Sequence, residues 1–315
     1  MRISGITCVS QKTHKIRCVL TAVLVLFLTS ATALSAISAY AAWKLLHPVK
    51  TNLEPFSTNI VPEYKDVSFV SRDKDITLSG WFFERKGGRG TVILAHSHGK
   101  NRLEFGEKTI DIIKRLIAEN YGVLAFDMRN SGKSKGKTST FGYLEKDDIL
   151  GAVDYAKLHG RGQIVLMGFS DGASASIMAA AETNDAAAVI ADSPYADLDS
   201  YLTENLSLRT NLPAFPFNRT ICYSLKLLAG IDTKASSPLK LISAVSPRPL
   251  LLIHGKDDTL IPPENSRELY TAYFKASGKN PAICEFEAAG HLESYTKRPK
   301  EYMDRVIEFL GSLKD

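Results

Sequence analysis

The sequence has few cysteines and no cluster of metal-ligating side chains. Its 315 residues include four cysteines, and Cys8 and Cys18 lie close to the N-terminus. The rest of the chain then contains only Cys222 and Cys284, which excludes a disulfide scaffold and leaves a single bridge between these two open. No CxxC pair or Cys/His cluster has the spacing of a zinc site. We therefore expect no metal.

The sequence also lacks a strong charge of either sign. The formal charge is +5, and four basic residues precede an apolar N-terminal segment: Arg2, Lys12, Lys15 and Arg17. The remainder is close to neutral, so a nucleic-acid partner is not expected. Two Gly-Lys-Ser/Thr triplets begin at Gly132 and Gly136, but Asp127 and Ser131 stand where a phosphate-binding loop needs its earlier glycine. This excludes a nucleotide site of that type.

The apolar N-terminal segment has no charged residue from Cys18 to Trp43. A run of this length can cross a bilayer as a helix. The basic residues before it predict a single-pass membrane protein with a cytoplasmic N-terminus and an extracytoplasmic domain. The alternative is a cleaved signal peptide and a secreted product, because Ala39-Tyr40-Ala41 offers small residues at a suitable spacing. We expect a basic tail (1–17), an anchor or signal segment (18–43), a linker (44–62) and one domain (63–315).

Within the domain, short apolar runs alternate with helical patterns. Val67 to Val70 and Ile76 to Phe83 predict an opening antiparallel pair of strands. Six further runs are typical of buried parallel strands: Thr91 to Ala95, Val123 to Phe126, Ile164 to Met167, Ala187 to Ala191, Leu250 to Ile253 and Ala282 to Phe286. The sequence therefore predicts an α/β fold with a mostly parallel sheet between two layers of helices. A long proline- and aromatic-rich interval indicates a small helical cap inserted at about 195–245.

A nucleophile is predicted where the run Ile164 to Met167 ends. The residues Gly168-Phe169-Ser170-Asp171-Gly172 follow this strand and precede a helical segment. This is the G-x-S-x-G pattern in the strand-turn-helix setting that it requires, with glycines where the sharp turn leaves no room for side chains. Ser170 is thus the candidate nucleophile, and the backbone N–H of Asp171 is a candidate oxyanion donor.

A serine hydroxyl needs a base, and the base needs an acceptor. Asp257 and Asp258 follow the run Leu250 to Ile253, and His291 follows the last strand. Both sites lie downstream of the serine, in the chain order Ser, Asp, His that belongs to this arrangement. We expect His291 as the base and Asp258 as the acid, with Asp257 as the alternative acid.

The loop after Thr91 to Ala95 reads His96-Ser97-His98-Gly99. The second oxyanion donor should come from this loop, and the backbone N–H of His98 is the first candidate. The side chains of His96 and His98 either act in the reaction or only organise the loop by hydrogen bonds.

Together these motifs resemble the α/β-hydrolase superfamily, in particular its serine-aminopeptidase-like and prolyl-oligopeptidase-like branch. The resemblance covers about Val67 to Leu313 and includes a turn similar to D-x-R-G-x-G-x-S at Asp127, which would shape a wall of the site. In this family the acid is followed by the pattern x-[LV]-[IV]-P. The residues after Asp258 match this pattern, which favours Asp258 over Asp257 as the acid. Ser97 and His98 depart from the residues usual in the oxyanion loop.

The resemblance implies a serine hydrolase that needs no cofactor and acts on a small-molecule or peptide acyl substrate. We expect cleavage of a carboxylic ester or related acyl bond through an acyl-enzyme. A serine peptidase of the aminopeptidase or oligopeptidase type uses the same chemistry and stays an alternative. A non-catalytic binding or signalling protein on the same scaffold is the alternative from another class.

Overall fold

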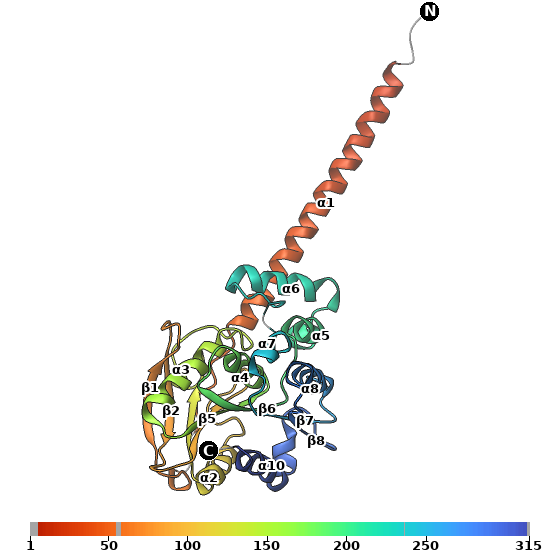
Figure 1. Ribbon diagram of the computed structural model, residues 1–315. Helices are drawn as coiled ribbons and strands as arrows, with labels where there is room; N and C mark the ends of the chain where they lie inside the picture. The colour runs from red at the N-terminus through yellow and green to blue at the C-terminus, as the bar shows by residue number, and fades with distance from the viewer. Residues whose placement is uncertain (1–5, 55–57, 236, 314–315) are drawn as a thin grey trace, which may run out of the picture.

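The computed structural model describes residues 6–54, 58–235 and 237–313, and an eight-stranded sheet lies at its centre (Figure 1). The strands run in the order β1-β2-β4-β3-β5-β6-β7-β8. Their bounds are β1 Lys65–Val70, β2 Thr77–Phe83, β3 Gly90–Ala95, β4 Tyr121–Asp127, β5 Gln163–Phe169, β6 Ala186–Asp192, β7 Leu250–Gly255 and β8 Ala282–Phe286. The expected opening pair β1 and β2 is antiparallel, β2 pairs antiparallel with β4, and the remaining pairs are parallel. The predicted mostly parallel sheet is confirmed.

Helices cover both faces of this sheet. One face carries α3 (Glu145–His159), α4 (Asp171–Ala181), α7 (Pro238–Val245) and α8 (Glu264–Ser277). The other carries α2 (Lys108–Ala118), α9 (Glu293–Lys297) and α10 (Pro299–Gly311). The strands between the two layers are continuously apolar because both of their faces are buried. The carboxyl ends of the parallel strands share one edge, where functional groups of such sheets gather.

Two further helices, α5 (Leu198–Thr210) and α6 (Ala214–Ala229), form a lid with a small core of its own. Tyr201, Leu206 and Ile221 are buried there together with Phe141 and Ile261 from loops of the body. Helix α7 lies within the interval expected to be the cap, but it packs on α4 and α8 in the body. We use the word lid for α5 and α6 only.

Helix α1 (Ile6–Leu46) projects away from the rest of the molecule for most of its length (Figure 1). It begins within the expected basic tail and ends within the expected linker. Thr13–Leu46 is long and apolar enough to cross a membrane. Its C-terminal end packs against α6, where Ala42 and Leu46 are buried in the core of the lid. The Ser38 hydroxyl lies 2.7 Å from that of Thr220.

The segment after α1 is held against the body by hydrogen bonds. Ser139 N–H donates to Leu46 O at 2.8 Å, and Gly132 N–H donates to Thr51 O at 3.0 Å. The Thr51 hydroxyl donates to Gly99 O at 2.5 Å, beside the expected oxyanion loop. A short 3-10 helix, Thr58–Ile60, then leads into β1. The two domain cysteines lie in different parts of the fold, Cys222 in α6 and Cys284 in β8, and both are free thiols.

Candidate active site

Ser170 stands on a strained turn between β5 and α4. Its φ of +53° lies in the left-handed region, which is uncommon for a residue with a side chain. A Cβ on Gly172 would lie 2.3 Å from His96 O, and one on Gly168 would lie 2.3 Å from Gly172 O. Neither position can hold a side chain without moving backbone. The pattern of glycines therefore follows from how closely α4 approaches β3 at this elbow.

His291 lies between Ser170 and Asp258. Its Nδ1 is 2.7 Å from Asp258 Oδ2, and its Nε2 is 2.9 Å from Ser170 Oγ. The carboxylate fixes the Nδ1–H tautomer, so Nε2 is free to accept the serine proton. The other carboxylate oxygen, Asp258 Oδ1, accepts from the N–H groups of Leu260 and Ile261 at 3.0 and 2.9 Å. The predicted nucleophile, base and acid thus form one continuous hydrogen-bond chain.

Their environments shift the pKa values in opposite directions. Burial of the Asp258 carboxyl opposes ionisation, but hydrogen bonds from His254 and His291 outweigh it and lower the pKa to about 2. Burial of His291 lowers its pKa, but the hydrogen bond and the charge of Asp258 outweigh burial and raise the pKa above its usual value. Asp258 is therefore ionised near neutral pH, and its charge favours the protonated form of the His291 imidazole.

The alternative acid, Asp257, is exposed, and its backbone N–H is bonded to Ala289 O. His254 is fully buried, with its ring nitrogens 2.7 Å from Ser266 Oγ and from Ile261 O. It holds the loop that carries Asp258 by these hydrogen bonds and is a structural residue.

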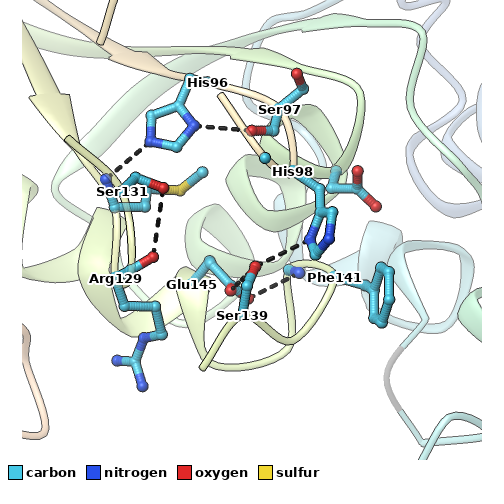
Figure 2. A pocket seen from close by; sticks show the side chains of 12 residues that line it. His96, Ser97, His98, Arg129, Ser131, Ser139, Phe141 and Glu145 are labelled. Atoms are coloured by element: carbon cyan, nitrogen blue, oxygen red, sulfur yellow. Dashed lines mark hydrogen bonds between the residues drawn. The ribbon is translucent and has the colours of Figure 1, made fainter. Parts of the chain in front are cut away.

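A small pocket, with a cavity volume of about 10 Å³, lies next to Asp171, the residue that follows Ser170 (Figure 2). Both predicted oxyanion residues, His98 and Asp171, line it. The turn that follows β4 contributes Met128, Arg129 and Ser131 to the lining, as the resemblance implied. The structure thus brings the two loops expected to supply the oxyanion donors to one space.

The side chain of His96 organises this loop. Its Nδ1 lies 2.8 Å from Ser97 O, and its Nε2 accepts from Met128 N–H at 2.9 Å (Figure 2). Both nitrogens are used by backbone groups, and burial lowers the pKa of His96, so the ring is held neutral. Of the two roles considered for this side chain, the structure displays the organising one.

The side chain of His98 stacks on Phe141 with ring centroids 4.6 Å apart, and its Nδ1 lies 2.9 Å from Ser139 Oγ (Figure 2). Ser139 donates in turn to Glu145 Oε1 at 3.0 Å. Glu145 also accepts from Thr140 N–H at 2.7 Å. This buried carboxylate therefore fixes both the loop under the lid and the orientation of the His98 ring.

Two residues at the site were not predicted from the sequence. The first is Glu104, a buried carboxylate that accepts from Ser97 N–H at 2.6 Å and from Ser97 Oγ at 2.8 Å. It holds the oxyanion loop from behind. Burial raises its pKa to about 7. Glu104 lies outside any periodic segment, so no sequence signal marked it.

The second is Arg209, which reaches from α5 of the lid toward the pocket. Its guanidinium lies over the rings of Phe141 and Tyr201, 5.6 and 5.5 Å from the centroids, and donates to the Tyr201 hydroxyl. Its Nε is buried without a hydrogen-bond partner among the residues that the structure describes. The same holds for Asp171 Oδ1. A basic and an acidic side chain at this site thus each keep one buried atom without a partner among the described residues.

No group of three or more His, Cys, Asp or Glu side chains within the described ranges is placed to hold a metal ion.

Comparisons with known proteins agree with this geometry. Residues 127–314 match the prolyl oligopeptidase family. The Bacillus subtilis protein YqkD is 34% identical over 229 residues, which cover 71% of this chain and 72% of that protein. The Saccharomyces cerevisiae membrane protein YNL320W is 24% identical over 254 residues, 78% of this chain and 79% of its own.

Among solved structures, the Pyrococcus furiosus esterase Pf2001 superposes with a TM-score of 0.69 at 28% identity, over 86% of this chain and 99% of the esterase. The expected α/β-hydrolase fold is confirmed.

Proposed function

The chain belongs to the prolyl oligopeptidase family and is a serine hydrolase, and from this premise we propose that Ser170, His291 and Asp258 are its catalytic triad and that its substrate is a carboxylic ester. The observation that carries the triad is the hydrogen-bond chain from Ser170 Oγ through His291 to Asp258, at 2.9 and 2.7 Å. The three side chains come from three separate loops at one edge of the sheet.

In the proposed reaction, His291 Nε2 takes the proton of Ser170 as its Oγ attacks the acyl carbon. The backbone N–H groups of His98 and Asp171 hold the oxyanion in the pocket that both residues line. The protonated His291 gives its proton to the leaving alcohol, and the acyl group stays on Ser170. Water, activated by His291, then attacks the acyl-enzyme and releases the acid.

One comparison favours an ester over a peptide. The Pyrococcus furiosus protein that superposes along nearly its whole length is an esterase.

One observation favours the second candidate, a peptidase that acts on aminoacyl substrates. Asp171 follows the nucleophile directly, and its buried Oδ1 has no hydrogen-bond partner among the described residues. A free carboxylate oxygen at this place is suited to accept a hydrogen bond from an α-ammonium group.

A fluorophosphonate probe tests the hydrolase chemistry directly. We expect the wild-type protein to be labelled and Ser170→Ala not to be, with kcat lower by about 10³- to 10⁶-fold on any substrate turned over. Ser200→Ala, at an exposed serine of the lid, is the matched control and should label like the wild type. Labelling of Ser170→Ala, or none of the wild type, would contradict the triad.

Substrate class is then decided by a panel. The proposal predicts turnover of p-nitrophenyl acyl esters of graded chain length and little turnover of aminoacyl or prolyl anilides. The opposite preference, lost in Asp171→Asn, would establish the aminoacyl peptidase instead.

For its location, the proposal is a retained single-pass anchor with a cytoplasmic N-terminus and an extracytoplasmic domain. The yeast relative is called a membrane protein. The end of α1 also packs in the lid core, so removal of the helix would expose apolar lid surface. An epitope tag before Arg2 should remain on the full-length protein in the membrane fraction. Only the catalytic domain should be open to protease added on the extracytoplasmic side. A tag lost by cleavage would establish the secreted form.

A further inference from the structure

The outer face of α6 is unusually apolar for a surface helix. Tyr223 and Leu227 are 64% and 68% exposed on this face, and Phe215, at the non-helical start of α6, is 89% exposed. The opposite face of the same helix, including Ile221 and Leu225, is buried in the lid core. Large apolar side chains therefore lie on both sides of the helix, although only one side touches protein. Such a face needs an apolar partner.

The position of α1 indicates what that partner is. Helix α6 lies across the C-terminal part of α1, from which α1 extends away from the molecule (Figure 1). The contact is fixed by the hydrogen bond between Ser38 and Thr220. Any bilayer that α1 crosses therefore comes to the lid side of the molecule, next to α6.

The aromatic residues of α1 fix the depth of this contact. Tyr40 and Trp43 are exposed, with ring centroids 6.5 Å apart, and both follow Ser38, which contacts α6, within the next two turns of α1. Tyrosine and tryptophan prefer the interface between headgroups and acyl chains. Counting back from Tyr40, about 20 helical residues span a hydrocarbon core of about 30 Å and reach Leu20, close to Arg17 at the other side. The exposed face of α6 then lies at the level of the headgroups.

The charges on α6 suit this depth. Arg219 is exposed one turn before Tyr223, and Lys226 is exposed beside Leu227. Helices that lie in the plane of a membrane interface combine aromatic and aliphatic anchors with basic side chains that reach the lipid phosphates.

No glycan is expected on this surface. Asn218 and Asn205 each begin a glycosylation acceptor triplet, but both are buried and donate to backbone carbonyls, so neither offers its side chain for a glycan.

We propose that the outer face of α6, formed by Arg219, Tyr223 and Leu227, together with Phe215 at the start of α6, binds the surface of the bilayer that α1 crosses. The inference rests on the proposed membrane attachment, and it adds a second contact through the lid. The lid is then held from two directions, by the end of α1 and by the lipid interface.

Spin labels on the full-length protein test this surface. The background replaces all four cysteines by alanine, and single cysteines are introduced as Leu227→Cys on α6, Leu28→Cys inside α1 and Leu158→Cys on α3. Leu158 is the matched control, because it is an 80% exposed leucine on a helix of the body. Each variant is first shown to react with the fluorophosphonate probe. The proteins are placed in nanodiscs of phosphatidylcholine with phosphatidylglycerol, and relaxation by oxygen and by a water-soluble nickel chelate is measured.

We expect the label at Leu227 to be about threefold or more less accessible to the nickel chelate than the label at Leu158, and intermediate in depth between Leu158 and Leu28. If the label at Leu28 is in lipid but the label at Leu227 is as accessible to the chelate as the label at Leu158, α1 crosses the membrane and the proposed contact of the lid with lipid is wrong. If Leu28 is as open to the chelate as Leu158, the membrane attachment itself is wrong and the lid proposal is lost with it.

Discussion

At the scale of single residues, the carboxylate of Asp258 controls the basicity of His291. Its hydrogen bond and charge raise the pKa of His291 above the usual value, so kcat/KM should rise with pH as this histidine loses its proton. Asp258→Asn removes the charge. We expect kcat to fall by about 10⁴-fold and the acidic limb of the pH profile to move to lower pH.

The control for that change is Asp257→Asn, the neighbouring and exposed aspartate. Its rate and pH profile should match the wild type. If kcat fell further in Asp257→Asn than in Asp258→Asn, Asp257 would be the acid of the triad instead of Asp258. The pH profile is the informative measurement, since a purely structural defect would lower the rate without moving the limb.

Glu104 gives a second prediction at this scale. Burial raises its pKa from 4.5 to about 7, so the unfolded chain releases this proton at lower pH than the folded protein does. The stability contributed by protonated Glu104 is complete below pH 4.5 and is lost as the pH rises to about 7. Glu104→Gln does not titrate. Between pH 5 and pH 8 the variant should therefore lose less stability than the wild type, by up to about 3 kcal/mol.

Thermal unfolding at the two pH values measures this difference. Asp148 and Asp192 also have raised pKa values, about 7 and about 6, but they titrate in both proteins and cancel in the comparison. Glu107→Gln, at an exposed glutamate nearby, should follow the wild type. Equal losses in wild type and Glu104→Gln would contradict the buried titration.

The residues that the sequence predicted at the site share a property that Glu104 and Arg209 lack. Ser170, Asp258 and His291 each lie within five residues of the carboxyl end of a strand, so the edge of the sheet already places them together. Glu104 accepts a hydrogen bond from Ser97, seven positions earlier in the same loop. The position of Arg209 over Phe141 depends on how the lid packs on the body. Neither arrangement follows from periodicity, because long-range packing decides which of many polar side chains becomes buried.

At the scale of elements, the lid contributes one charge to the site. Burial opposes the charge of Arg209, but Tyr201 and Asp171 attract it and raise its pKa. In Arg209→Met, no positive charge from the lid offsets the negative charge of Asp171, which lies beside the proposed oxyanion site. We expect kcat/KM for esters to fall by about tenfold, a change of about 1.4 kcal/mol. Adding Asp171→Asn should restore part of the loss, since it removes the uncompensated charge.

A double-mutant cycle on kcat/KM measures this coupling. Its control is Arg219→Met, at an exposed arginine on the outer face of the lid. On a soluble short-chain ester, Arg219→Met should leave the rate unchanged. Additive losses in the double variant would mean that Arg209 acts only by packing on Phe141 and Tyr201.

The elements themselves were predicted better than their ends. Every expected strand is present, because runs of apolar residues buried on both faces are distinctive. Helix α1 extends beyond the uncharged stretch at both ends, since helix formation does not stop where apolar residues do. The interval expected to be the cap includes helix α7, because its sequence does not reveal that Ile242 and Val245 pack into the core of the body.

At the scale of the whole molecule, helix α1 and the lid share one hydrophobic core. Ala42 is completely buried between α1 and the lid, whereas Ala36 on the same helix is exposed. Ala42→Leu inserts a larger side chain where no space exists, and overpacking of this kind costs about 1–3 kcal/mol. Ala36→Leu adds the same atoms to an exposed surface, which the proposed anchor would place in lipid, so it should be neutral.

The measurement is the temperature at which the full-length protein in lipid nanodiscs loses fluorophosphonate labelling. We expect Ala42→Leu to lose it at a lower temperature than both the wild type and Ala36→Leu. If the two variants are equal, the end of α1 is not part of the folded core, and the helix is only a tether. A lowered midpoint confined to Ala42→Leu would mean that a single residue of the anchor stabilises the lid over Ser170, because Ala42, Tyr201 and Phe141 belong to the same cluster.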